Sequence, residues 1–364
     1  MNGHTDRRDV PVLLLHNLDP EWDPDGLREA RRHANTAQRA LAALGHPISS
    51  AAVRHADLRK VLRRWNPADH VVLNWCEELP GLPKSDVLVV KILEEEGFTY
   101  TGSDEKSITL AWDKVRARET LQRKHVPIPQ GRLFERAEAG GWKKFPAIVK
   151  PAYQHCSFGI SSESVVFSSK QLVERVAYIL EEFEEPALVE DFIDGREFRV
   201  TVWGNGRPQV LPVAEMDYSA FPEACDRLCT YDAKFEPESR HYREIALRLP
   251  APLTRAEQRK IERVALAAHR AMGSRDYSRS DIRLRDGEFY VLDANPNPDI
   301  CSDASMACSA EAGGFGYGEM LSHIVNLAAA RHSTWQRAEE PASAQVAVPV
   351  GARRSSVRAS ASAA

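Results

Sequence analysis

The sequence lacks long hydrophobic runs, and no window approaches the roughly 18 consecutive apolar residues that predict a membrane-spanning helix. Its first residues, MNGHTDRRDV, have no apolar core of the kind that a secretory signal peptide needs. Cysteine is also scarce, with six in 364 residues, and in a chain without a leader this suggests reduced thiols. We therefore expect a cytoplasmic protein that does not span a membrane.

A large excess of one charge is missing too. Lysine and arginine number 48 against 52 acidic residues, so the net charge of −4 gives no electrostatic case for nucleic-acid binding. The chain has no GxxxxGKS/T phosphate loop, no Gly-x-Gly-x-x-Gly after a strand, no GxSxG elbow and no metal-binding spacing among its histidines. Zinc binding by Cys225, Cys229, Cys301 and Cys308 stays open, although their spacing fits no common zinc pattern.

What the sequence does have is an ordinary globular composition, 43% hydrophobic and 27% charged, with enough residues for two or three domains. Apolar runs at residues 10–15 and 70–73 predict buried strands. Capped amphipathic stretches at 25–44 and 85–96 predict helices between and after them. Alternating strands and helices indicate a small parallel α/β domain at the start of the chain.

The second half of the chain has a different pattern. A long, mostly helical segment at 104–125 precedes a strand-and-helix unit that predicts an α+β layer, with strands at 145–151, 161–167, 187–192 and 197–203 around a helix at 169–183. Residues 217–244 form a long irregular stretch, which in a compact domain is typical of a functional lid. A capped helix is expected at 254–272 and a last one at 319–330.

Residues 280–297, SDIRLRDGEFYVLDANPN, predict a hairpin around an Asp286-Gly287 turn. If its loop has three residues, Asp281 and Asp293 share one face and Arg279 joins them, whereas a two-residue loop separates the two aspartates. We therefore expect an odd-length loop. Such a face would offer hard oxygen ligands for Mg²⁺ beside a cation. An ordinary edge hairpin with solvated charges is the alternative interpretation.

Other candidate residues are weak signals when each is taken alone. Lys150 ends an apolar strand beside a loop of small residues, where a lysine can reach a phosphate. An edge lysine whose stem covers apolar surface is the more common finding at such a position. Lys114 and Glu190 are no more specific.

The order of these segments changes the interpretation, because together they resemble the ATP-grasp superfamily and, within it, the D-alanine–D-alanine ligase group. The resemblance runs from about residue 100 to residue 327 and rests on five segments in order: YTGS with AWDK (100–103 and 111–114), PAIVKP (146–151), LVEDFIDGREFRV (188–200), YDAKF (231–235) and RSDIRLRDGEFYVLDANPN (279–297). The third of these resembles the group's pattern L-I-E-K-W-L-x-G-x-E-F-T-V.

The resemblance implies an ATP-grasp fold of mixed α/β and α+β class in three parts. A small parallel α/β domain would cover residues 1–112, a central α+β lid domain 113–203, and a C-terminal α+β domain with the metal site 204–335. Residues 336–364, rich in Ala, Ser and Arg, cannot bury a core and are expected to be a disordered tail.

The resemblance also implies roles for individual residues. ATP would be bound by Lys114, Lys150, Ser157, Glu190, Asp191, Phe192, Ile193, Glu197 and Lys234. Lys234, on the lid, and Arg279, which would stabilise the oxyanion of the tetrahedral intermediate, would be catalytic. Two Mg²⁺ ions, for which Mn²⁺ can substitute, would be held by Asp281, Asp293 and Asn295. Substrate-binding candidates are Glu21, Cys156, Tyr231, Asp299 and Asp303.

Several positions depart from the group's pattern. Cys156 stands where the group has a serine, and Phe235 where it has a tyrosine. Residues 17–29 lack the G-G-x-S-x-E pattern, and PNPD at 296–299 replaces T-S-P-G. The resemblance therefore implies an ATP-dependent carboxylate–amine ligase that uses an acyl phosphate and substrates other than D-alanine.

A D-alanine–D-alanine ligase proper, or a nucleotide-binding regulatory module without catalysis, are the alternatives. The implied partners are a small-molecule carboxylate and an amine, with neither nucleic acid nor membrane, and a homodimer stays open.

Overall fold

The computed structural model describes residues 6–336, so the predicted tail from residue 337 onward lies outside the described residues. The described chain forms two compact units. One contains the residues up to Thr101 together with those from Gly316 onward, and the other contains Gly102–Phe315. The finer division into three domains stays a prediction.

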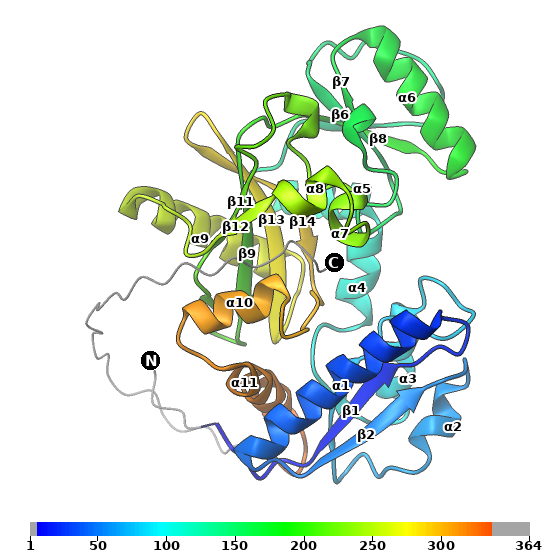
Figure 1. Ribbon diagram of the computed structural model, residues 1–364, viewed down its shortest axis with the longest axis vertical. Coiled ribbons are helices and arrows are strands. Elements are labelled where there is room, and N and C mark those ends of the chain that lie inside the picture. Colours follow the sequence, from blue (N-terminus) through cyan, green and yellow to red (C-terminus); the bar gives the residue numbers. More distant parts are fainter. Residues whose placement is uncertain (1–5, 337–364) are drawn as a thin grey trace. The chain divides into compact units, whose positions relative to one another are not determined.

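The first unit is built on a parallel sheet with the strand order β2-β1-β3-β4 (Figure 1). Its strands are β1 (Val12–Asn17), β2 (Ile48–Val53), β3 (Val71–Trp75) and β4 (Thr99–Tyr100), and its helices are α1 (Pro24–Leu44), α2 (Leu58–Leu62), α3 (Asp86–Glu95) and α11 (Tyr317–Ala329). The predicted parallel α/β part is therefore present. The sequence did not predict β2, because ISSAAV has few large apolar side chains.

Local sequence explains how the longest helix of this unit begins and ends. The side chain of Asp23 accepts a hydrogen bond from the backbone N–H of Gly26, and Gly45 ends α1 in the left-handed conformation (φ 100°). The C-terminal helix α11 then packs closely on α1. A Cβ atom at Gly318 would lie only 2.8 Å from the carbonyl oxygen of Ala40, so this contact requires glycine.

The second unit contains two antiparallel sheets. The smaller has the order β5-β8-β6-β7. Its strands are β5 (Gly131–Phe134), β6 (Ala147–Pro151), β7 (Val165–Val166) and β8 (Ala187–Asp191), and α6 (Ser169–Glu182) packs on it. The strand predicted at 161–167 is shorter than expected, because a 3-10 turn (Ser162–Ser164) occupies its first half.

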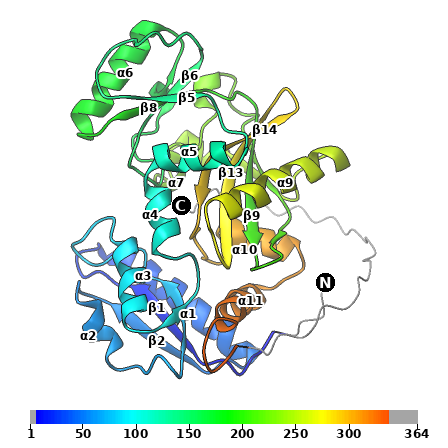
Figure 2. The ribbon, with the colours of Figure 1, turned by 180° about the vertical axis from the view of Figure 1, so that it is seen from behind.

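The larger sheet has the order β12-β11-β9-β13-β14, with β10 added to β9. Its strands are β9 (Arg196–Trp203), β10 (Gln209–Val210), β11 (Ala214–Asp217), β12 (Ala246–Arg248), β13 (Tyr277–Arg285) and β14 (Glu288–Asn295). One face is apolar, with Phe198, Val200, Ile282 and Val291 buried under α9 (Arg255–Ala271), which Figure 2 shows across the sheet. Alternation of side chains along the strands leaves the other face for charged residues.

Three further parts of this unit differ from the sequence-based expectation. The helical segment at 104–125 is two helices, α4 (Glu105–Trp112) and α5 (Lys114–Arg123), because Asp113 turns away from helical geometry and caps α5. Helix α10 (Ser305–Ala312) was not predicted. The irregular stretch holds a 3-10 turn (Ala224–Asp226) and helices α7 (Asp232–Phe235) and α8 (Arg240–Glu244), packed on a small core that includes Tyr218 and Phe221.

The hairpin of β13 and β14 corrects one prediction. Arg285 pairs with Glu288, so the loop has two residues, Asp286 and Gly287, and the expectation of an odd-length loop is wrong. Both loop residues have positive φ angles, 53° and 73°, as a type I′ turn requires.

A β-bulge nevertheless brings the two aspartates together. Ile282 pairs with Val291, but Asp281 pairs with Asp293, so Leu292 is an extra residue on β14. Without the bulge the two-residue loop would place Asp281 opposite Leu292. Asp281 and Asp293 therefore share a face, as expected, but the bulge rather than the loop provides the needed shift.

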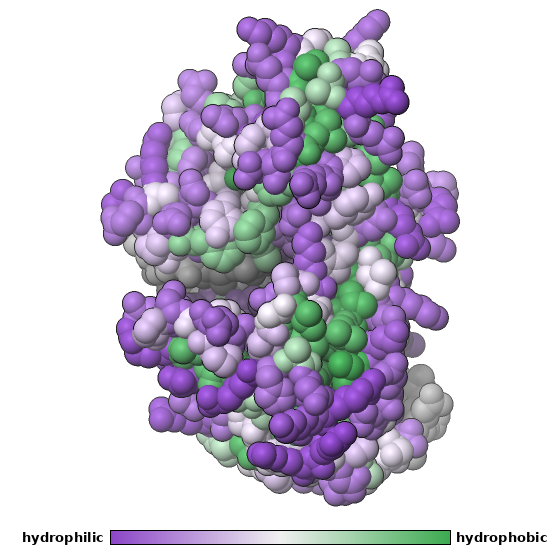
Figure 3. Space-filling view, turned by 90° about the vertical axis from the view of Figure 1, so that its right-hand side faces the viewer, coloured by the Kyte–Doolittle hydropathy of each residue, from purple (hydrophilic) through white to green (hydrophobic). Residues whose placement is uncertain are grey.

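Polar residues predominate on one face of the molecule. Figure 3 shows one face covered largely by hydrophilic residues, with apolar residues in smaller groups between them. Among residues 6–336, no helix is both long enough and apolar enough to cross a bilayer.

His269 on α9 should make the stability of the second unit depend on pH. It is 4% exposed, its Nδ1 lies 2.7 Å from Ser278 Oγ, and burial, aided by Arg270, lowers the pKa of His269 to about 4. The unfolded chain therefore binds a proton that the folded chain does not between about pH 6.5 and 4. Stability is complete above this window and is lost as the pH falls through it.

When the pH falls from about 7 to about 4.5, the free energy of unfolding of wild type should fall by on the order of 2–3 kcal/mol more than that of His269→Gln. The free energy of unfolding in urea at each pH measures this. The exposed His55, changed to Gln, is the control and should behave as wild type. Equal losses in wild type and His269→Gln would contradict the assignment.

Candidate active site

A pocket in the second unit brings together the residues that the sequence marked for ATP, metal and catalysis. Its lining includes all of them: Lys114, Lys150, Ser157, Glu190, Asp191, Phe192, Ile193, Glu197, Lys234, Arg279, Asp281, Asp293 and Asn295. Cys156 also lines it, whereas Tyr231, Asp299 and Asp303 do not. Glu21 belongs to the first unit and is exposed. The roles of all these residues, inside and outside the pocket, stay predictions.

One end of the pocket is the charged face of the larger sheet. Register places Asp293, Asp281 and Arg199 side by side on β14, β13 and β9. Asn295 and Arg279 form the next row. Adjacent strands lie about 4.8 Å apart, so these rows concentrate carboxylate and guanidinium groups within a few ångströms.

The acidic and basic side chains at this end of the pocket stabilise one another's charged forms. Arg279 is 4% exposed, and its Nε and Nη2 donate to the two carboxylate oxygens of Asp281 at 2.9 and 3.3 Å. Burial works to raise the pKa of Asp293, but Lys114 and other cations nearby hold that pKa well below its ordinary value. Burial also lowers the pKa of Lys114, which Asp293 partly offsets. The Asp293 carboxylate therefore stays ionised and available as a ligand.

The smaller sheet supplies the opposite wall. Glu190, 2% exposed on β8, forms ion pairs with both Lys150 on β6 and Arg118 on α5. The neighbouring Asp191 is bound by Arg285 and Lys144, at 2.5 and 2.8 Å. Both carboxylates are thus held by cations, and Phe192 and Ile193, which follow β8, also line the pocket.

The far end of the pocket is apolar, lined by Ile148, Ile160, Phe192 and Leu228. Phe192 and Leu228 are 3% and 6% exposed and pack together with Val165. A flat apolar group fits such an end, and a polyanion with cations fits the other.

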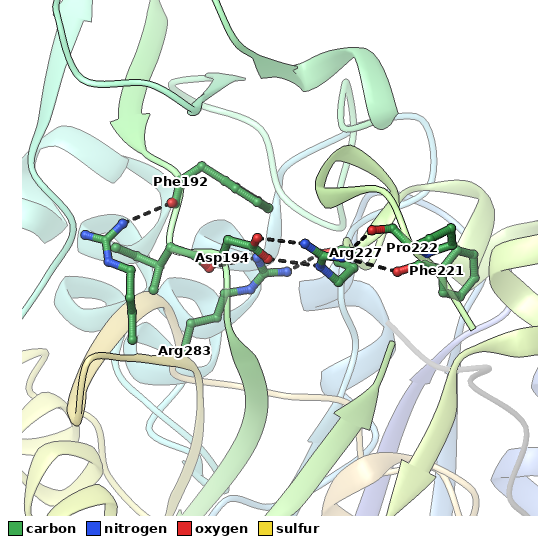
Figure 4. Close-up of polar contacts among 8 residues, drawn as sticks. Phe192, Asp194, Phe221, Pro222, Arg227 and Arg283 are labelled. Atoms are coloured by element: carbon green, nitrogen blue, oxygen red, sulfur yellow. Dashed lines mark hydrogen bonds and ion pairs between the residues drawn. The ribbon is translucent and has the colours of Figure 1, made fainter. Parts of the chain in front are cut away.

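Arg283 connects the charged face of the larger sheet to the segment after β8 and to the irregular stretch at residues 217–244, called the lid from here on. It was not among the site residues predicted from the sequence. Only 1% exposed, it donates from Nε to Glu197 at 2.8 Å, from Nη1 to the carbonyl of Ile193 at 3.0 Å, and from Nη2 to the carbonyl of Arg227. Figure 4 shows it between the segment of Phe192 and the segment of Arg227. The alternation Arg279, Asp281, Arg283 along one strand face was the signal that could have identified it.

The lid is also bonded to the pocket wall through Arg227. Its guanidinium holds the carboxylate of Asp194 at 3.0 and 2.7 Å and donates to the carbonyl of Pro222 at 2.7 Å (Figure 4). On the other side, Ser157 Oγ donates to the carbonyl of Cys229 at 2.9 Å. These bonds place Lys234, on α7, beside the pocket.

Comparison with known proteins gives the family. A family model described as D-ala D-ala ligase C-terminus matches residues 119–326. A D-alanine–D-alanine ligase of Chelativorans sp. is 31% identical over 80% of this chain and 90% of its own length. An uncharacterized protein, y4sG of Sinorhizobium fredii, is 29% identical over 76% of this chain and 81% of its own.

The chain belongs to the D-alanine–D-alanine ligase family. It is accordingly an ATP-dependent ligase that joins a carboxylate to an amine through a carbon–nitrogen bond. A crystal structure of the D-alanine–D-alanine ligase from Bacillus anthracis complexed with ATP matches with a TM-score of 0.66 at 17% identity, over 89% of this chain and 98% of that one. This likeness confirms the predicted ATP-grasp fold.

The loop that follows β6, residues 152–159, has an unusual backbone. Cys156 and Ser157 both have positive φ angles, 54° and 62°, although neither is glycine. Consecutive non-glycine residues in this region are uncommon and persist where the surroundings fix them. Two contacts with the lid provide that support. The ring of Phe158 packs at a tilt against Tyr231, with 5.0 Å between the ring centroids, and Ser157 forms a hydrogen bond to the lid.

The buried Arg283–Glu197 pair allows a test of how this site is held together. We expect Arg283→Met to lower the free energy of unfolding by about 3–5 kcal/mol, because it leaves Glu197 as an unpaired buried charge. Glu197→Gln in the same chain should recover much of that loss. Urea unfolding of the single and double variants measures the coupling, and strictly additive effects would contradict it.

Proposed function

We propose that the enzyme activates a small carboxylic acid as an acyl phosphate and joins it to an amine other than D-alanine, releasing ADP and phosphate. The observation that supports this most directly is the paired row of Asp281 and Asp293 beside Lys114 and Lys150, opposite an apolar end of the same pocket. A nucleotide with its base at the apolar end and its phosphates at the charged end matches that polarity.

The donor set also fits a magnesium nucleotide. Asp281, Asp293 and Asn295 offer only oxygen ligands, which Mg²⁺ prefers, and the low pKa of Asp293 keeps that group ionised. When bound, the metal would neutralise charge on the phosphates. We propose these three residues as its ligands.

The first step needs positioning and charge neutralisation rather than a protein nucleophile. A carboxylate oxygen of the acid bonds to the γ-phosphorus, the bond from that phosphorus to the β,γ-bridging oxygen breaks, and ADP leaves with the electron pair. Lys114 and Lys150 hold the phosphates, and Lys234 closes over them from the lid. The closed lid keeps water away from the acyl phosphate.

In the second step the amine nitrogen attacks the acyl carbon, and phosphate leaves as the carbon–oxygen bond breaks. The nitrogen loses a proton on the way to the amide. Negative charge develops on the carbonyl oxygen, and we assign Arg279 to its stabilisation. A fixed, buried guanidinium is effective because it needs no reorganisation when that charge appears.

The substrates are proposed to differ from D-alanine because several departures from the family pattern fall outside the proposed ATP and metal positions. Cys156 and Phe235 replace a serine and a tyrosine, and Asp299 stands in place of a glycine. An acidic side chain at 299 disfavours an amine substrate that carries its own free carboxylate. Glu190 and Glu197 keep the residues of the pattern quoted for their segment, whereas Asp191 and Arg199 stand where it has a lysine and a threonine.

ADP release should therefore require both an acid and an amine, and D-alanine alone should support none. A screen of acid–amine pairs for ADP, followed by the mass of the product, measures this, and hydroxylamine in place of the amine should give a hydroxamate from the acyl phosphate. Asp293→Asn should reduce turnover by at least about 10³-fold while the thermal unfolding midpoint stays near wild type. ATP binding without turnover for any pair would point to a regulatory module.

Phe235→Tyr alone should not create D-alanine ligation, because Cys156 and the N-terminal segment also differ from the family pattern. The product mass with D-alanine as both substrates is the measurement, and wild type is the control. Formation of the D-alanine dipeptide by the single variant would show that this one hydroxyl decides specificity. Its formation by wild type would identify a D-alanine–D-alanine ligase proper.

A further inference from the structure

Arg199 is a buried cation on the charged face whose role the proposed function leaves open. It lies in the middle of β9, is 5% exposed and lines the pocket. The family pattern quoted for this segment has a threonine at its position, so the arginine is a feature of this chain. The mismatch in GREFRV against G-x-E-F-T-V was the sequence signal for it.

Its guanidinium has few partners within the chain. Among the described residues, its side chain makes one hydrogen bond, from Nη2 to the Sγ of Cys229 at 3.2 Å, and no ion pair within 4.0 Å. Arg283, by contrast, is bonded to Glu197 and to two carbonyl oxygens. A guanidinium carries five N–H donors, and a buried charge with unmet donors is costly.

The surroundings keep this group charged and add a hydroxyl donor. Burial works to lower the pKa of Arg199, but Cys229, Asp281 and Tyr218 more than offset it, so the pKa lies above its ordinary value. Burial also raises the pKa of Tyr218 well above its usual range, so that its hydroxyl stays protonated. That hydroxyl and the Thr201 Oγ1 are buried without a hydrogen-bond partner among residues 6–336.

The position of Arg199 indicates which anion it meets. It is the third member of the row Asp293, Asp281, Arg199, and its guanidinium reaches up to Cys229 on the lid. Lys234 follows on the same lid segment and lines the same pocket. The guanidinium thus lies between the proposed metal ligands and the lid, where the terminal phosphoryl group of ATP would sit under the proposed function.

We propose that Arg199 binds the phosphoryl group that moves from ATP to the acid, contacting its non-bridging oxygens before and after transfer. The planar fork of arginine matches two phosphoryl oxygens at once, which a threonine at this position could not do. This inference rests on the proposed function for the identity of the transferred group. The acid's own carboxylate is the competing anion.

Nucleotide affinity separates these possibilities without turnover. Calorimetry in magnesium buffer with the β,γ-imido analogue of ATP and with ADP should show that Arg199→Met loses at least about tenfold in affinity for the analogue. Affinity for ADP, which lacks the terminal phosphoryl group, should stay within about twofold. Arg199→Lys keeps the charge and should fall between. Arg263→Met, at an exposed position on α9, removes the same charge outside the pocket and is the control.

Three results would overturn the proposal. Equal loss for the analogue and ADP would make Arg199 a structural residue, as would a matching fall in the unfolding midpoint of both Arg199 variants. Unchanged nucleotide affinities with a raised KM for the acid would assign it to the acid's carboxylate. A selective loss of analogue binding in a protein that ligates no acid–amine pair would leave the contact with the terminal phosphoryl group of ATP standing and remove the proposed function instead.

Discussion

One extra residue in β14 determines the chemistry of the larger sheet. Because side chains alternate along a strand, the two-residue Asp286-Gly287 loop would by itself put Asp281 and Asp293 on opposite faces. The bulge at Leu292 shifts the register by one, so both carboxylates join the charged face while Val291 stays with the core under α9. Glycine and aspartate specify the turn locally, and the bulge supplies the shift that the turn cannot. The site exists only because both are present.

The geometry of the pocket is fixed because most of its buried charges are matched in pairs. Arg283 meets Glu197, Arg279 meets Asp281, and Glu190 is shared by Lys150 and Arg118. Buried pairs of this kind contribute little net stability, since desolvation offsets their attraction, but removing one partner is strongly destabilising. Such pairs therefore fix geometry more than they add stability. In this setting a buried cation with a single weak partner, such as Arg199, is conspicuous.

Much of the fold could be predicted from sequence where pattern and local chemistry agree. The apolar strands and capped helices of the first unit follow from periodicity, and the set of site residues follows from the order of five motifs. Prediction failed where a tertiary contact decides. The strands β2, β11 and β12 are short or polar and exist because neighbours pair with them, and the bulge at Leu292 leaves no local signal. Arg199 and Arg283 were overlooked because an arginine in a strand shows its role only once burial is known.

The contacts of the lid bear on how catalysis and specificity are separated in this chain. Arg227 ties the lid to Asp194 after β8, and Arg283 ties it to β13, so the lid is anchored through the wall that would hold the nucleotide. Two further contacts, from Ser157 and Phe158, come from the loop that follows β6, where Cys156 departs from the family pattern. Under the proposed function, a change of acid or amine can therefore alter the loop side of the lid while the anchored side holds Lys234 beside the pocket. This arrangement allows substrate preference to change without rebuilding the phosphoryl-transfer machinery.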